Sequence, residues 1–244
     1  VLKLLRDGAM RIQKQLGWIG LFVWLGCVST VWSGQYGDPS GFSLTYPDNW
    51  LKLTSQEKAT LEKKVTPEVK KWLTAYKVDL SKVAVVLIRD GKEDYLESVN
   101  VVVIDKQMAI NESTLKQAIK EYARIGVKTD QVKGRIDTLH GRSVAITDYP
   151  LTIPSAKTTV QQRQIMIPGG GKTFFITCTA LPKTFAQHEP TFKQIIASFK
   201  APEPKPENDQ AYEIGILSGL VAVIVVAAIM LARRFMKRSS ASSV

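Results

Sequence analysis

The chain has 244 residues, of which 45% are hydrophobic and 23% are charged, and its formal net charge is +11. Most of that charge lies at the two ends. Residues 1–33 and 214–244 hold eight Lys and Arg against one Asp, whereas residues 34–213 hold 25 Lys and Arg against 21 Asp and Glu. The long central part therefore lacks the basic stripe that phosphate binding requires, and nucleic acid is excluded as an expected partner.

The N-terminal region is predicted to form a first transmembrane helix over residues 16–33. No charged residue occurs between positions 15 and 37, and residues 1–15 contain four Lys and Arg against one Asp. This basic excess predicts that residues 1–15 are a cytoplasmic flank. Two alternatives stay open: a signal peptide cleaved near residues 31–33, and a lipoprotein signal ending at Cys27, although Trp24 stands where that motif usually has Leu.

A second transmembrane helix is predicted over residues 213–232. Residues 214–232 are an uncharged, mostly apolar run. As a helix this run spans roughly 28 Å, close to the ~30 Å hydrocarbon core of a bilayer. The tail 233–244 opens with Arg233 and Arg234 and is expected on the cytoplasmic side. We therefore expect a two-pass protein of a bacterial inner or photosynthetic membrane, with both termini cytoplasmic and the main domain periplasmic or lumenal.

The predicted membrane segments carry aromatic residues and small residues at informative places. Trp18 and Trp32 flank the first segment and Tyr212 precedes the second, as interfacial anchors do, and Arg233 and Arg234 anchor the other end of the second segment. Gly215 and Gly219 form a Gly-x-x-x-Gly spacing, and Gly26 lies in the matching half of the first segment. Small residues let helix backbones approach closely in lipid. These three glycines are therefore candidates for helix packing, within the chain or with a partner protein.

Residues 34–200 are expected to form one extracytoplasmic domain, because this length suffices for a substantial core. Residues 201–212 are expected to be a linker. Pro202, Pro204 and Pro206 stand at every second position there, which favours extended polyproline II structure.

Within the domain, the patterns alternate between strand and helix. A helix with Asn111 as its N-cap and Gly126 at its end is the best marked. Gly-containing turns near residues 139–141 and 168–171 predict two hairpins. Strands are expected at 41–46, 83–89, 98–105, 132–138, 142–149, 160–167 and 172–181, and helices over 61–76, 112–125 and 185–199. This order favours an α+β fold, an α/β/α sandwich with a central antiparallel sheet, plus the two transmembrane helices.

Three segments resemble PsbP-like domains, the family of the photosystem II extrinsic subunit PsbP and its bacterial relatives. Residues 42–50 read Phe-Ser-Leu-Thr-Tyr-Pro-Asp-Asn-Trp and resemble the family's opening strand and Tyr-Pro-x-x-Trp corner. Residues 172–180 and 192–199 resemble its last strand and terminal helix. The resemblance covers roughly residues 41–200 and implies an α/β/α sandwich that docks on other macromolecules. It supplies no functional residue, and the two membrane segments are a departure from PsbP itself.

The chemistry-bearing residues predict no catalytic, cofactor or metal site. The glycines of 169–171 precede Lys172 and Thr173, but Met166 stands where a phosphate-binding loop needs glycine, so a hairpin turn explains them better. His140 is expected in a tight turn and His188 in a helix, without metal-ligand spacing. Cys178 is expected to be a buried thiol.

We therefore expect a non-catalytic, membrane-anchored accessory or assembly subunit. Its partners would be the lipid bilayer and an integral membrane complex, on whose outer face the domain docks; the resemblance suggests a photosynthetic or respiratory complex. The alternative is an extracytoplasmic domain that binds a small ligand and has a receptor or delivery role.

Overall fold

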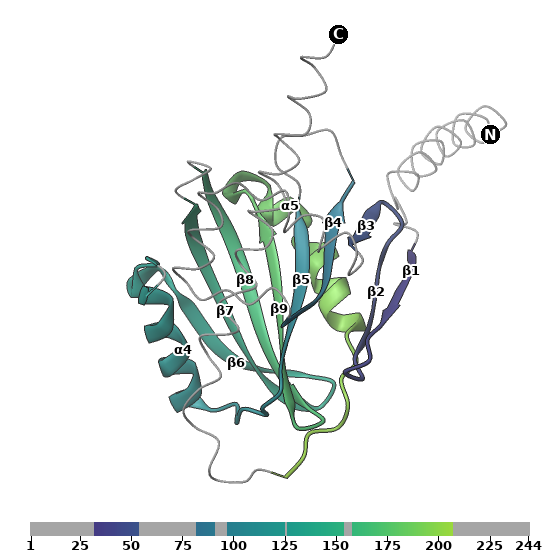
Figure 1. Ribbon diagram of the computed structural model, residues 1–244. Coiled ribbons are helices and arrows are strands. Elements are labelled where there is room, and N and C mark those ends of the chain that lie inside the picture. Colours follow the sequence, from purple (N-terminus) through teal and green to yellow (C-terminus); the bar gives the residue numbers. More distant parts are fainter. Residues whose placement is uncertain (1–31, 54–81, 91–96, 125, 154–157, 207–244) are drawn as a thin grey trace, which may run out of the picture. The chain divides into compact units, whose positions relative to one another are not determined.

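The computed structural model describes residues 32–53, 82–90, 97–124, 126–153 and 158–206. Within them, nine strands and two α-helices form an α+β fold dominated by antiparallel pairing (Figure 1). The elements, in chain order, are β1 (Trp32–Gly37), β2 (Ser43–Pro47), β3 (Trp50–Leu53), β4 (Val83–Arg89), β5 (Ser98–Ile104), α4 (Glu112–Arg124), the short 3₁₀ helix η2 (Thr129–Gln131), β6 (Lys133–Leu139), β7 (Arg142–Ile153), β8 (Thr158–Gly169), β9 (Lys172–Ala180) and α5 (Pro182–Ser198).

Seven strands form one antiparallel sheet in the order β3-β4-β5-β9-β8-β7-β6, and β1 and β2 pair in a separate two-stranded sheet. The interior strands β4 and β5 read as nearly continuous apolar runs because both of their faces are buried. β5 pairs with β9 from Ser98 opposite Thr179 to Ile104 opposite Thr173. The expectation of a largely antiparallel sheet is confirmed.

Two tight turns connect the long hairpins. His140 and Gly141 join β6 to β7 with φ of 51° and 79°, and Gly170 and Gly171 join β8 to β9 with φ of 63° and 81°. Two successive residues with positive φ match the right-handed twist of the flanking strands. Both predicted turns are confirmed, and the strands β7 and β8 extend further from them than predicted.

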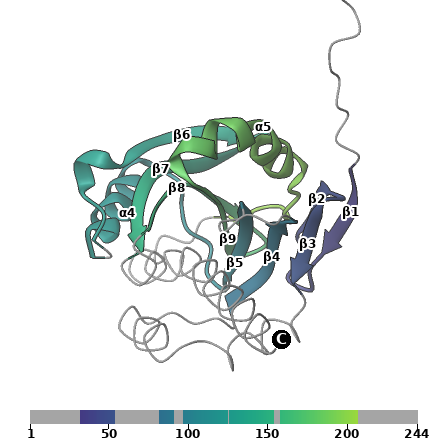
Figure 2. The ribbon, with the colours of Figure 1, turned by 90° about the horizontal axis from the view of Figure 1, so that it is seen from above.

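The two helices lie on opposite faces of the large sheet (Figure 2). α4 buries Leu115 and Tyr122 against side chains that include Met166 and Phe175. Its predicted cap is present, because the Asn111 Oδ1 accepts a hydrogen bond of 3.0 Å from the Thr114 backbone N–H.

α5 covers the other face and begins at Pro182, three residues before the predicted start. Proline is favoured in the first turn of a helix, where its missing N–H has no intrahelical partner.

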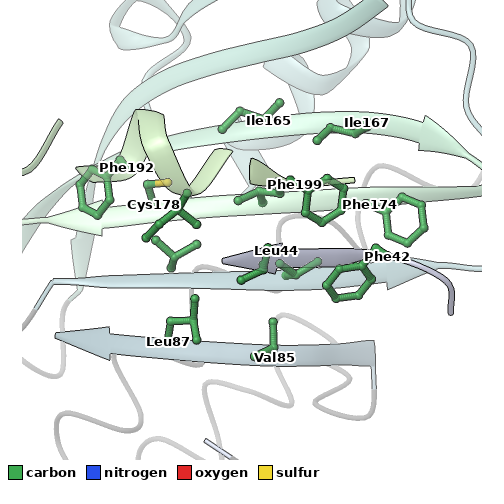
Figure 3. Close-up of a cluster of buried hydrophobic side chains, with 14 of the residues drawn as sticks. Phe42, Leu44, Val85, Leu87, Ile165, Ile167, Phe174, Cys178, Phe192 and Phe199 are labelled. Atoms are coloured by element: carbon green, nitrogen blue, oxygen red, sulfur yellow. The ribbon is translucent and has the colours of Figure 1, made fainter. Parts of the chain in front are cut away.

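One cluster of hydrophobic side chains packs against α5. Phe42, Trp50, Ile176, Ile195 and Phe199 are buried in one cluster, and Tyr46 and Ile196 pack at its partly buried edge. The Phe42 and Phe199 rings stack with centroids 5.1 Å apart (Figure 3). The terminal helix therefore packs on the sheet.

The first strand is a difference from the predicted organisation. Trp32 and Ser33, assigned above to the first apolar segment, are the first residues of β1, and Trp32 pairs with Pro47. Trp32 is half-buried against the core beneath α5, so its ring has an intramolecular partner in addition to its predicted interfacial role. The segment 34–40, which reads like a short connection, is mostly strand because β2 supplies its backbone partners.

The helix predicted over 61–76 lies outside the described residues, as do residues 16–31 and 213–232 of the predicted membrane segments. In the described part of the chain, no helix has the length and apolarity needed to cross a membrane.

Candidate functional site

Residues 200–206, the C-terminal strap, run across one end of the large sheet. The strap begins at Lys200, whose backbone N–H and C=O exchange hydrogen bonds of 2.8 and 2.9 Å with Ser43. The Gly170 N–H donates to the Glu203 carbonyl at 2.8 Å. Further along, Gln107 donates to the Lys205 carbonyl at 2.6 Å and accepts from the Lys205 N–H at 2.9 Å. The first residues of the predicted linker 201–212 are therefore held on the domain.

Arg142, the first residue of β7, anchors this strap from the adjacent turn. Its Nη1 donates to the carbonyl oxygens of Pro202 at 2.9 Å and Pro168 at 3.2 Å. Its Nη2 donates to the Ala201 carbonyl at 3.3 Å and to Glu203 Oε1 at 3.3 Å. Because the Arg142 side chain is only 12% exposed, these acceptors replace most of its contact with water.

The glycines of the β8–β9 turn explain how the strap comes so close. A Cβ built on Gly169 would lie 2.4 Å from the Pro202 carbonyl oxygen, and one on Gly170 would lie 3.0 Å from the Pro202 Cβ. Only glycine leaves room for this backbone approach. The interpretation of the Gly-Gly-Gly run as a hairpin turn is confirmed. Close packing of the strap is a second reason why glycine stands at these positions.

A pocket of about 330 Å³ opens between the strap, the β6–β7 turn and the end of α5. Its apolar lining comes from Leu139, Ile167, Phe199 and Ala201, and its polar lining from His140, Arg142, Lys200 and Glu203. Lys200 and His140 are exposed, whereas Arg142 is largely buried. The pocket thus combines an apolar floor with a rim in which three basic side chains face one acid.

The pocket supplies binding groups of two kinds. Apolar side chains take apolar ligand atoms out of water, and the basic side chains pair with an anionic group. We define this site as the strap pocket. Sequence analysis did not single out Arg142, Lys200 or Glu203. The available signal was local: an arginine directly after a His-Gly turn, and a proline-rich segment directly after an apolar helix.

A second polar cluster ties α5 to the opposite end of the sheet. The Glu97 carboxylate, 3% exposed, lies 2.5 Å from Arg89 Nε and 3.2 Å from His188 Nε2, and it accepts a 3.2 Å hydrogen bond from the Thr184 hydroxyl. Arginine neutralises the buried carboxylate, so the cluster fits a structural latch between β4, β5 and α5. His188 is helical as predicted, and its contact with Glu97 is a tertiary one.

A third cluster links α5 to the sheet through Arg163. Arg163 forms hydrogen bonds to Asp148 at 2.7 Å and to Glu189 at 2.8 Å. The hydrogen bond from Arg163 lowers the pKa of Glu189, against an opposing effect of burial. Burial alone would lower the pKa of Arg163, but its two carboxylate partners outweigh burial and raise it. This cluster also positions a helix rather than a ligand.

The remaining predicted site residues fall mostly outside the described structure. Only Trp32 is described, in β1; the others, Trp18, Gly26, Tyr212, Gly215, Gly219, Arg233 and Arg234, lie outside the described residues. In the part of the chain that the structure describes, no group of three His, Cys, Asp or Glu side chains could hold a metal ion. Cys178 is a free buried cysteine, as expected, and burial raises the pKa of its thiol.

Comparison of the sequence with known proteins finds no matching family model and no matching curated protein. Comparison with solved structures does find similar chains. The solution structure of cyanobacterial PsbP (CyanoP) from Synechocystis sp. PCC 6803 is 13% identical, with a TM-score of 0.45, over 74% of this chain and 98% of that one.

Two further solved structures are similar over most of their length. LpqN of Mycobacterium tuberculosis, described as involved in cell envelope biogenesis, is 16% identical over 70% of this chain and 90% of that one, with a TM-score of 0.41. The Ran-binding protein Mog1p of Saccharomyces cerevisiae is 10% identical over 72% and 97%, with a TM-score of 0.43. The α+β fold is assigned to this chain from its own strand order and helix packing.

Proposed function

We propose that this protein is a non-catalytic, membrane-anchored accessory or assembly subunit whose PsbP-like domain docks on an integral membrane complex through the strap pocket. The pocket carries the proposal, because it joins an apolar floor to exposed charge, the combination found in protein recognition sites. The apolar, basic-flanked segments at both ends of the sequence support the membrane anchor. An extracytoplasmic position and a photosynthetic or respiratory complex belong to the same proposal.

The position of the pocket at the end of the domain supports this role. The strap is the start of the chain that leads toward the second apolar segment, and it forms one wall of the pocket. A partner bound there would contact the chain between the domain and its anchor.

The test is co-purification of the full-length chain in mild detergent. The double variant His140→Asn with Lys200→Gln removes both exposed basic side chains of the pocket, and asparagine tolerates the φ of 51° at residue 140. We expect the yield of co-purifying membrane complex to fall by about half or more. The matched control is Lys183→Gln, an exposed lysine at the start of α5. Lys183 lies about 22 Å from the end of that helix at 1.5 Å per residue.

Equal yields from the double variant and the wild type would show that docking uses another surface. A second candidate, binding of a small ligand, is favoured by the volume of the pocket, which falls within the range of small-molecule sites. If the wild-type chain purifies alone in mild detergent, this second function replaces the first.

A further inference from the structure

We infer that the strap pocket takes an acidic peptide segment of the partner, and that Glu203 occupies the carboxylate position while the pocket is free. The inference rests on the proposed docking function and specifies the chemistry of the docked segment. An apolar side chain of the peptide would lie against Leu139 and Ala201, the two half-buried apolar residues of the lining, close to the buried Ile167 and Phe199. A neighbouring carboxylate would meet Arg142 and Lys200.

The Arg142 guanidinium can pair with a carboxylate that is closer and better aligned than that of Glu203. Three of its four hydrogen bonds go to backbone carbonyl oxygens, and these hold the strap. Its only carboxylate partner among the described residues is Glu203, at 3.3 Å. A guanidinium that is largely withdrawn from water is compensated most effectively by a close, well-aligned carboxylate. Among the described residues, the largely buried Arg142 cation therefore has a single, long contact to an acid.

Glu203 is a weak competitor for that position. Its side chain is 91% exposed, and it contacts Arg142 through one oxygen only. An exposed side chain retains its rotamer freedom and its hydration, so a pair of this kind stabilises little. An incoming carboxylate can replace it without disturbing the strap, because the Glu203 backbone carbonyl keeps its separate bond to the Gly170 N–H.

Lys200 and His140 supply the remaining charge complementarity. Both are exposed on the rim, and neither forms an ion pair with a residue that the structure describes. With Arg142 and Lys200 charged and Glu203 displaced, the rim is positive. Such a rim attracts acidic segments and disfavours basic ones. A pocket of about 330 Å³ accommodates one or two side chains, which fits an extended peptide rather than a folded surface.

The experiment uses the full-length chain in mild detergent and a fluorescein-labelled peptide, Ala-Leu-Glu-Leu-Glu-Ala, followed by fluorescence anisotropy. Its matched probe has Gln in place of both Glu residues. We expect the Glu peptide to bind at least about fivefold more tightly than the Gln peptide. Lys200→Gln should weaken binding of the Glu peptide about threefold, and Glu203→Gln should strengthen it about twofold to fivefold. Lys183→Gln should change nothing.

The results separate this inference from the function it rests on. Equal binding of the two peptides, no binding of either, or an unchanged affinity in Glu203→Gln would overturn the carboxylate assignment. Competition by free N-acetyl-leucine as strong as by unlabelled peptide would assign the pocket to a small carboxylic acid instead. If the carboxylate assignment fails while the His140/Lys200 double variant still loses its complex, the docking function stands without it. Lys200 and Glu203 are exposed, so these variants are expected to fold.

Discussion

The Arg142 guanidinium donates a 2.9 Å hydrogen bond to the carbonyl oxygen of Pro202, 60 residues further along the chain. This bond joins the β6–β7 turn to the segment that leaves the domain. Together with the bonds from Gly170 to Glu203 and from Gln107 to Lys205, it holds the exit as far as residue 205. The strap therefore belongs to the folded domain, and it creates the pocket that we assign to docking.

Removing the Arg142 guanidinium should release the strap. Arg142→Gln loses charge-assisted hydrogen bonds to carbonyl groups, and we expect the free energy of unfolding to fall by about 2 kcal/mol. Amide hydrogen exchange at Gly170 should become faster, because its acceptor is on the strap. The control Arg135→Gln changes an arginine that is 49% exposed and should cost less than about 0.5 kcal/mol. Unchanged exchange at Gly170 would mean that the backbone bonds alone hold the strap.

The packing of α5 predicts a large cost for truncating Phe199. Its side chain is 1% exposed and contacts the rings of Phe42 and Phe174, with centroids 5.1 and 5.7 Å away. Phe199→Ala should lower the free energy of unfolding by about 3–5 kcal/mol in chemical denaturation. Leu51, which is 40% exposed, provides the control, and Leu51→Ala should cost less than about 1 kcal/mol. A loss below that level for Phe199→Ala would contradict the observed packing.

Two neighbouring tyrosines on the α4 face offer a matched pair of variants. The Tyr122 hydroxyl donates to Gln164 Oε1 at 2.8 Å and lies 2.7 Å from the Thr147 hydroxyl, which is therefore the donor in that contact. Tyr122→Phe removes the hydrogen-bond partner of both Gln164 Oε1 and the Thr147 hydroxyl, which are buried. We expect the free energy of unfolding to fall by about 1–3 kcal/mol. The Tyr149 ring lies 4.3 Å away, but its hydroxyl makes no hydrogen bond of good geometry with a residue that the structure describes.

Tyr149→Phe should therefore be neutral or slightly stabilising in thermal denaturation, because it removes a buried polar group that gains little from its surroundings. Equal losses in the two variants would show that the two hydroxyl groups are equally well bonded.

The Arg163–Glu189 contact predicts a contribution to acid sensitivity. The pKa of Glu189 is lowered from its ordinary value of 4.5, chiefly by the hydrogen bond from Arg163. Between the folded and unfolded pKa values the unfolded state binds more protons, so stability rises with pH in that window. The contribution is fully present above pH 4.5 and is lost as the pH falls through the lower folded value.

Urea denaturation between about pH 6 and about pH 3 should therefore show a smaller loss of stability in Glu189→Gln than in the wild type. Asp130→Asn changes an exposed acid without an ion pair among the described residues, and its pH profile should follow that of the wild type. If Glu189→Gln and the wild type lose stability in parallel, the contact contributes nothing in this range.

The charge distribution predicts the topology of the full chain. Basic residues precede the first apolar segment and follow the second one, so both termini are expected in the cytoplasm. A tag placed after Val244 should be reached by an impermeant reagent only after the cells are opened. Labelling in intact cells would reverse the predicted orientation.

The local elements of the fold could be predicted from the sequence. β4 was predicted with its observed bounds, and α4 was predicted through its Asn111 cap and its apolar face. The two hairpin turns followed from their glycines. These features depend on interactions between residues close in sequence, such as capping, turn geometry and the repeat of apolar positions. The burial of Phe42 and Phe199 is also what their residue type leads one to expect, because large aromatic side chains are usually buried.

Only the tertiary structure decided the rest. β1 contains Gly34 and Gly37, which weaken its strand signal in the sequence, and it is a strand because β2 lies beside it. The proline-rich segment after residue 200 resembles a free linker, yet Arg142 and Gln107 hold it on the sheet. The strap pocket combines side chains from the β6–β7 turn, β8, α5 and the strap. Such contacts join residues far apart in sequence, and no local pattern of propensity or periodicity encodes which distant segment a side chain will meet.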